Sequence, residues 1–143
     1  MKTTLAYLHP LLQVLALLIA LATLRLGLAL KGHRGGRRRV ANWAEIFERH
    51  TQLGLLGVGL LSGGYLLGLL SMPLLRQRPP LRSAHFFFAT LALALFLAGG
   101  YSGWRLKRGT KKYAEVRDLH GFLVYLGLFL SLGAAIMGFA LLP

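Results

Sequence analysis

Four histidines stand at equivalent places in four apolar stretches of this chain, and each is followed eighteen residues later by a glycine. The four pairs are His9 with Gly27, His50 with Gly68, His85 with Gly103 and His120 with Gly138. Because an α-helix turns about 100° per residue, each glycine would lie on the same helix face as its histidine, roughly 27 Å along the axis. Imidazole is a common metal ligand, so a histidine repeated at a fixed register indicates a ligand set.

The same helix face carries small residues between each histidine and its glycine. At the seventh position after each histidine stand Ala16, Gly57, Ala92 and Gly127. At the fourteenth position stand Thr23, Gly64, Gly99 and Ala134. Both offsets fall within about 20 to 40° of the histidine on a helix. Each histidine therefore begins a groove of small side chains.

Composition indicates a membrane protein. Of the 143 residues, 55% are hydrophobic and the mean hydropathy is +0.58, which is too apolar for an ordinary soluble domain. Cysteine is absent, so disulfides, iron–sulfur clusters and thiolate-bound metals are excluded, and histidine must carry any metal chemistry. The net charge of +13 comes mainly from loops between the apolar stretches. That distribution is typical of a membrane topology signal and argues against nucleic-acid binding.

The apolar stretches predict four membrane-spanning helices in one domain over residues 1–143. They run over about 8–30, 50–71, 84–104 and 119–142, and each can cross a hydrocarbon core of roughly 30 Å. Pro73 is expected to end the second helix. The first is expected to be a retained helix rather than a cleaved signal peptide, because its histidine belongs to the fourfold pattern. The fold class is all-α, an integral-membrane up-down-up-down four-helix bundle made of two parallel helical-hairpin repeats.

The distribution of Lys and Arg predicts the orientation of this bundle. Loops 31–49 and 105–118 hold twelve of the 17 basic residues, and the opposite side holds four. By the positive-inside rule the basic loops are cytoplasmic, and both termini lie outside, in a periplasm or a lumen. A bacterial plasma membrane and a thylakoid membrane both fit this arrangement.

Alternating helix directions sort the histidines into two pairs. His9 and His85 begin inward-running helices and lie at the outer edge, whereas His50 and His120 begin outward-running helices and lie at the inner edge. The two helices of each pair are diagonal in the bundle, roughly 12 to 14 Å apart. Two imidazoles across that distance leave room for one metal, about 2 Å from each nitrogen. A bare ion would be undercoordinated, whereas haem iron brings four nitrogens and needs two axial ligands.

We therefore expect two haem b groups, each ligated by one histidine pair. The glycines at the eighteenth position would border the haem of the opposite edge and let the macrocycle approach the backbone; alternatively, they serve only close helix packing. The glycines predicted to line the cofactor sites are Gly27, Gly57, Gly64, Gly68, Gly99, Gly103, Gly127 and Gly138. Arg82 on the outer side and Arg49 on the inner side are candidate donors to the haem propionates.

The arrangement of the two histidine pairs resembles the four-helix core of the ascorbate-reducible transmembrane cytochrome b family, in which two bis-histidine haems pass electrons across membranes. The start Leu8-His9-Pro10, the helix openings Arg49-His50 and Leu119-His120 and the overall size are similar to a four-helix membrane family of unknown function from cyanobacteria and plastids. The resemblance covers nearly the whole chain. It implies electron transfer and leaves the chemistry at either end open.

The predicted function is that of a transmembrane b-type cytochrome, an electron-transfer protein or an oxidoreductase acting on ferric ion or a quinone. The electron donor and acceptor stay open, with ascorbate, a quinone, a ferredoxin or a flavoprotein as candidates. The lipid-embedded protein would be a homodimer or a subunit of a complex. The alternative is a small membrane subunit or assembly factor of a photosynthetic or respiratory complex. A transporter is disfavoured because the middles of the spans carry no ionisable residue.

Overall fold

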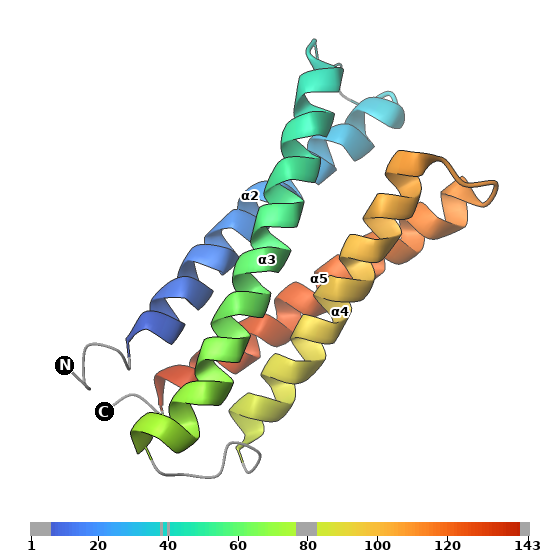
Figure 1. Ribbon diagram of the computed structural model, residues 1–143. Helices are drawn as coiled ribbons and strands as arrows, with labels where there is room; N and C mark the ends of the chain where they lie inside the picture. The colour runs from blue at the N-terminus through green and yellow to red at the C-terminus, as the bar shows by residue number, and fades with distance from the viewer. Residues whose placement is uncertain (1–6, 38, 40, 77–82, 141–143) are drawn as a thin grey trace.

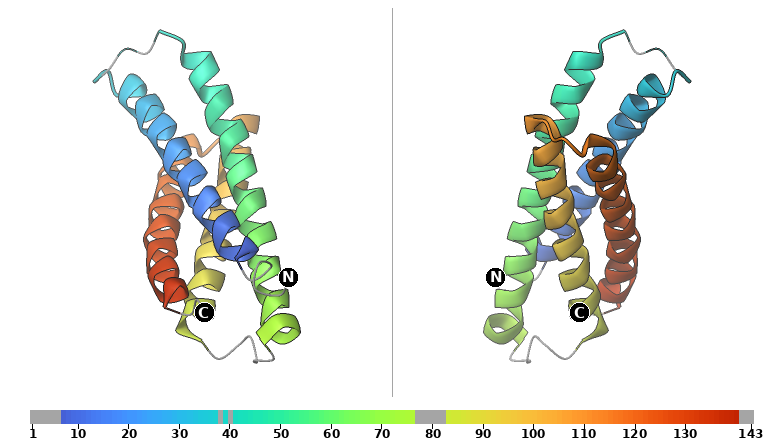
Figure 2. Two further views of the ribbon diagram at one scale, coloured as in Figure 1. Left: turned by 90° about the vertical axis from the view of Figure 1, so that its left-hand side faces the viewer. Right: turned by 90° about the vertical axis from the view of Figure 1, so that its right-hand side faces the viewer.

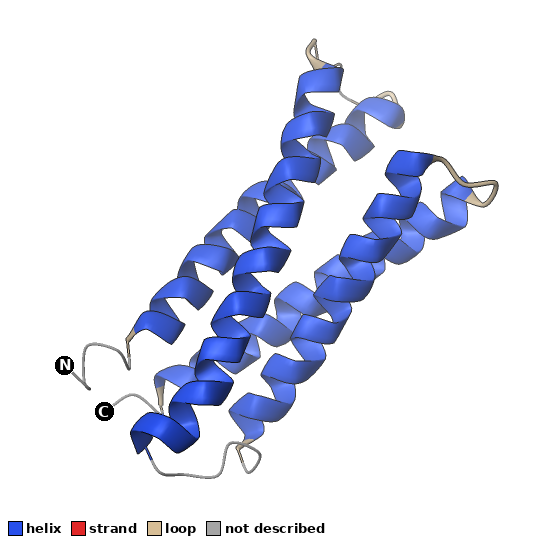
Figure 3. Cartoon of the chain, in the orientation of Figure 1, coloured by secondary structure: helices blue, strands red, loops and turns tan. Residues whose placement is uncertain are grey.

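The computed structural model describes residues 7–37, 39, 41–76 and 83–140, except for the side chains of 72–76. Four long antiparallel helices make up nearly all of this part of the chain (Figures 1 and 3). They are α2 (Leu8–Arg34), α3 (Trp43–Arg76), α4 (Ala84–Arg108) and α5 (Tyr113–Phe139). Each is long and apolar enough to cross a bilayer. The predicted all-α, up-down-up-down bundle with four candidate membrane spans is thus confirmed.

On the basic side, the helices extend beyond the apolar spans. The loop expected over 31–49 shrinks to 35–42, and the loop expected over 105–118 shrinks to 109–112. Lys, Arg and Glu are good helix formers, so the helices continue past the apolar residues until glycine interrupts them. Gly36 and Gly109 adopt φ angles of 71° and 81°, which favour glycine and turn the chain between helices.

On the opposite side, α3 does not end at Pro73. It continues to Arg76, so the expected helix end is wrong by about one turn. Proline lacks one backbone N–H donor, so the helix loses one hydrogen bond there. Because α3 ends three residues later, little of the helix lies beyond this break. At the start of α4 the Ser83 side chain accepts a hydrogen bond from the Phe86 amide at 3.2 Å, which caps the helix that carries His85.

The four helices pair as two hairpins, α2 with α3 and α4 with α5 (Figure 2). The hairpins contact each other more sparsely, chiefly along α3 and α4. Over the described residues the backbone of α2 does not approach that of α4 closely, nor does that of α3 approach that of α5, so both expected diagonals are present. Polar contacts between the hairpins include Tyr65 Oη with Thr90 Oγ1 at 2.8 Å, Arg34 Nη1 with Tyr113 Oη at 2.8 Å, and Lys107 Nζ with Glu48 Oε2 at 3.5 Å.

The predicted face of small residues is the interior of the bundle. Of the eight residues at the seventh and fourteenth positions, seven are buried and Thr23 is half-buried. Ala16 is 0% exposed and forms a central cluster with Leu61, Phe96 and Leu128. Many large apolar side chains point outward instead; Leu55, for example, is 78% exposed. Such an outside suits lipid, and close helix approach through small residues suits association in a membrane.

This arrangement predicts that Ala16 tolerates no larger residue. Ala16→Leu should destabilise the bundle by about 1 to 3 kcal/mol, because the added atoms have no space between the helices. Ala22→Leu makes the same chemical change on the exposed side of α2 and should have little effect. Unfolding in mixed detergent micelles, followed by circular dichroism, would measure both. Equal stability of the two variants would contradict the assignment of the interior face.

Candidate functional site

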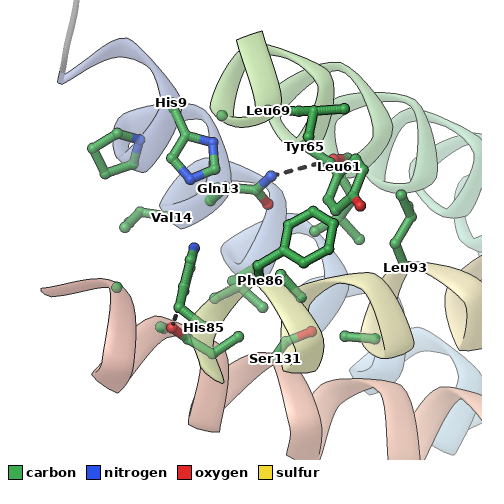
Figure 4. A pocket seen from close by; sticks show the side chains of 18 of the residues that line it. His9, Gln13, Val14, Leu61, Tyr65, Leu69, His85, Phe86, Leu93 and Ser131 are labelled. Carbon is green, nitrogen blue, oxygen red and sulfur yellow. Dashed lines mark hydrogen bonds between the residues drawn. The ribbon is translucent and has the colours of Figure 1, made fainter. Parts of the chain in front are cut away.

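The structure brings the four histidines together in two pairs at opposite ends of the bundle. The ring centroids of His9 and His85 lie 6.2 Å apart with their planes at 83°. Those of His50 and His120 also lie 6.2 Å apart, with their planes at 79°. Each pair connects one hairpin to the other across a diagonal. Figure 4 shows His9 and His85 turned toward one another.

Each imidazole is held by a hydrogen bond to the other helix of its own hairpin. The Nδ1 atoms lie 2.6 Å from Gly64 O for His9, 3.0 Å from Thr23 O for His50, 2.7 Å from Ala134 O for His85 and 2.9 Å from Gly99 O for His120. All four carbonyls belong to the residues at the fourteenth position. Because a carbonyl oxygen only accepts, Nδ1 must donate, and in a neutral imidazole Nε2 then keeps its lone pair. A hydrogen bond of this kind orients a metal-ligating histidine.

The glycines at the eighteenth position make room for these rings. A Cβ would lie 2.6 Å from His9 Cε1 at Gly68, 2.9 Å from His85 Cε1 at Gly138, 3.1 Å from His50 Cε1 at Gly27 and 3.2 Å from His120 Cε1 at Gly103. Each glycine therefore packs on the histidine of its hairpin partner, one turn beyond the carbonyl that this histidine binds. That they also border a haem stays a prediction.

Side chains of the neighbouring helices lie against the glycines at the seventh and fourteenth positions. The nearest atoms to a Cβ would belong to Ile19 at Gly57 (3.4 Å), Gln13 at Gly64 (2.7 Å), Val124 at Gly99 (3.3 Å) and Phe96 at Gly127 (3.4 Å). The expected groove is thus largely filled from within each hairpin. A role for these four glycines beside a cofactor stays a prediction.

A cavity opens between the hairpins beside His9 and His85, which are among its lining residues (Figure 4). Its other lining residues include the apolar Leu17, Leu61, Leu93 and Phe96 and the polar Gln13, Tyr65 and Ser131. Gln13 Nε2 donates to Leu61 O at 3.2 Å, which fixes the amide on the wall formed by α3. The site therefore combines two imidazoles with a mainly apolar space.

The structure brings Arg49 to a carboxylate. Its Nη2 lies 2.6 Å from Glu45 Oε1, and both side chains are half or more exposed. The other three acids also form ion pairs with basic residues: Glu48 with Lys107, Glu115 with Lys112 and Asp118 with Arg117. With twelve basic residues and four acids over 31–49 and 105–118, this end of the bundle keeps a strong positive charge. Arg82 lies outside the described residues.

Sequence reasoning missed two polar side chains that shape the sites. Gln13 stands one turn after His9, and the buried Ser102 donates from Oγ to Gly99 O at 2.7 Å while lying 3.2 Å from His120 Nδ1. Neither residue recurs at the equivalent position of another span, so the fourfold pattern could not reveal them. The signal that could have found them is the rarity of a polar residue on a buried membrane-helix face.

Within the described residues, no group of three or more His, Cys, Asp or Glu side chains could hold a bare metal ion. No protein-family model, curated protein or solved structure matches the chain.

The glycine contacts predict a graded series of variants. Gly68→Ala should displace the His9 ring from the Gly64 carbonyl and destabilise the fold by about 1 to 3 kcal/mol. Gly138→Ala should have the next largest effect on stability. Gly27→Ala and Gly103→Ala should destabilise the fold less, because the Cβ at each would lie farther from the histidine ring. Gly59→Ala is the control, since a Cβ there would meet nothing within 4 Å.

Chemical denaturation of the series and ¹⁵N NMR of labelled histidine would measure stability and the Nδ1–H bond respectively. An intact His9 Nδ1–H signal in Gly68→Ala, together with unchanged stability, would contradict the assigned contact.

Proposed function

We propose that this chain binds two haem b groups, one between His9 and His85 and one between His50 and His120, and carries single electrons across a membrane. The observation that carries the proposal is the ring separation of 6.2 Å in both pairs. With metal–nitrogen bonds of about 2 Å and about 1.1 Å from each nitrogen to its ring centre, two imidazoles on one iron have centroids about 6 Å apart.

The surroundings of both pairs support a metal centre that already has equatorial ligands. Each Nδ1 is bonded to a carbonyl, so Nε2 is the nitrogen left for an iron. A bound haem supplies one-electron ferric–ferrous chemistry. The histidines of each pair would hold the haem through their Nε2 atoms, and at His9 and His85 the mainly apolar cavity would limit the access of water.

The resemblance to the core of the ascorbate-reducible cytochromes supports the same function. By the positive-inside rule, the end of the bundle with loops 35–42 and 109–112 faces the cytoplasm or the stroma. The His50–His120 site then receives or delivers electrons on that side, and the His9–His85 site does so on the periplasmic or lumenal side. An anionic donor such as ascorbate, or an acidic or nucleotide-bearing redox protein, suits the basic end.

The first test is stoichiometry and site assignment. A pyridine haemochrome assay of the purified protein should give about two haems per chain, and His9→Ala or His50→Ala should each leave about one. The double variants His9→Ala/His85→Ala and His50→Ala/His120→Ala should also retain about one, because each removes a single site. Ring planes near 80° to each other should give the ferric protein a highly anisotropic low-spin EPR signal.

Absence of haem from protein expressed with an adequate haem supply would overturn this proposal. Loss of both haems in the double variant His9→Ala/His85→Ala, with the fold retained, would show instead that the pairs are not independent sites.

A second prediction concerns the basic end. Replacing Lys107, Arg108, Lys111 and Lys112 by Gln should slow reduction by an anionic donor several-fold at low salt and hardly at all at high salt. Such steering is screened over about 8 to 10 Å at physiological ionic strength. The matched control changes the three lysines to Arg, which keeps the charge. Stopped-flow reduction of the haem nearest this end measures the effect, and equal low-salt rates would leave these charges as topology signals alone.

A further inference from the structure

Phe96 is distinguished from the other aromatic side chains by its burial. Among the described Phe, Tyr and Trp residues it is the one that is buried, with 5% of its surface exposed. The other aromatic residues of the spans lie wholly or partly on the outside; Phe129, for instance, is 71% exposed. Burial in the middle of the bundle places Phe96 where the two histidine pairs could be connected.

The register of α4 places Phe96 between the two pairs. It stands eleven residues after His85 and seven before Gly103, which packs on His120, or about 16 Å and 10 Å along the axis. Side chains on a helix lean toward its N-terminus, which moves the ring toward the His85 end. The aromatic ring is therefore close to halfway between the two sites.

The contacts of Phe96 lie toward both ends of the bundle. It lines the cavity that His9 and His85 also line. Its ring atoms Cδ2 and Cε2 would be 3.4 Å from a Cβ at Gly127, which stands seven residues after His120 on α5. The eleventh residues after the other three histidines are Ala20, Leu61 and Ser131. Among the four spans, α4 thus has the single aromatic residue at this position of the repeat.

We propose that Phe96 is a positioning residue for electron transfer between the two sites, filling the space through which the electron tunnels. This inference rests on the proposed function. One electron passes from one iron to the other, so that one site is oxidised as the other is reduced, and no bond or proton changes. The rate of electron tunnelling falls less steeply with distance through packed atoms than through an empty space, which has no atoms in contact with its walls. Removal of the ring should therefore slow transfer without altering either histidine pair.

Phe96→Leu removes the ring and keeps an apolar side chain. In proteoliposomes with ferricyanide trapped inside and dithionite outside, it should slow ferricyanide reduction several-fold. Haem content should match that of the unmodified protein, and both midpoint potentials are measured so that the rates are compared at equal driving force. The matched control is Phe129→Leu, the same change at a similar depth on the exposed side of α5, which should leave the rate unchanged. Phe96→Met is a second variant, with a side chain that adapts to the space better than leucine.

A second readout does not depend on turnover. In a Trp43→Phe/Trp104→Phe background, Phe96→Trp introduces one indole at the proposed midpoint. Its fluorescence should be quenched to a similar degree by haem bound at the outer site alone, in His50→Ala, and at the inner site alone, in His9→Ala. Quenching by one site only would overturn the placement of Phe96 between them.

An unchanged rate in Phe96→Leu with two haems bound would overturn the proposal. So would loss of haem from both Phe96→Leu and Phe96→Met, because Phe96 would then act in packing alone. Failure of the proposed function is separately visible, since the unmodified protein would then contain no haem before any variant is compared.

Discussion

The hydrogen bond from each histidine Nδ1 to a carbonyl of the neighbouring helix determines the geometry of the remaining structure. An imidazole can reach a backbone carbonyl on another helix only if the two helices approach closely. That approach requires a glycine one turn beyond the carbonyl, where a Cβ would otherwise lie between 2.6 and 3.2 Å from the ring. It also requires small residues along the shared face, of which Ala16 and Gly64 are examples. The fourfold spacing of histidine, small residues and glycine therefore follows from the helix approach that this kind of hydrogen bond requires.

The same bond connects the fold to its proposed chemistry. It holds each ring before any ligand arrives, and it leaves Nε2 directed away from the helix that carries the carbonyl. Each of these four hydrogen bonds is made within a hairpin, whereas the rings themselves meet across the two hairpins. Each hairpin thus presents two imidazoles already oriented by hydrogen bonds, and the sparse contact between hairpins leaves a cavity beside His9 and His85. Ligands that are already fixed change little between two oxidation states, which favours rapid electron transfer.

The helix number, the topology and the interior face were predictable because each depends on side-chain type at a fixed period. The pairing of His9 with His85 also followed, since helix direction alone sorts the histidines by membrane edge. The helix ends on the basic side did not follow from hydropathy, because Lys and Arg extend a helix as readily as Leu does. The bonding partner of each ring was hidden because it is a backbone carbonyl, which every residue type possesses. The Arg49–Glu45 pair could have been predicted from its four-residue spacing on a helix.

The distribution of the four histidines over the two hairpins has a consequence for ancestry. Each hairpin contributes one histidine to the His9–His85 pair and one to the His50–His120 pair, and the two hairpins run in the same direction. A single two-helix chain would therefore contain half of each site. Two identical copies of such a chain, related by a twofold axis along the membrane normal, would complete both sites at once. The present chain has the arrangement expected of such a dimer whose gene was duplicated and fused, after which residues such as Gln13, Phe96 and Ser102 could diverge without a matching change in the other half.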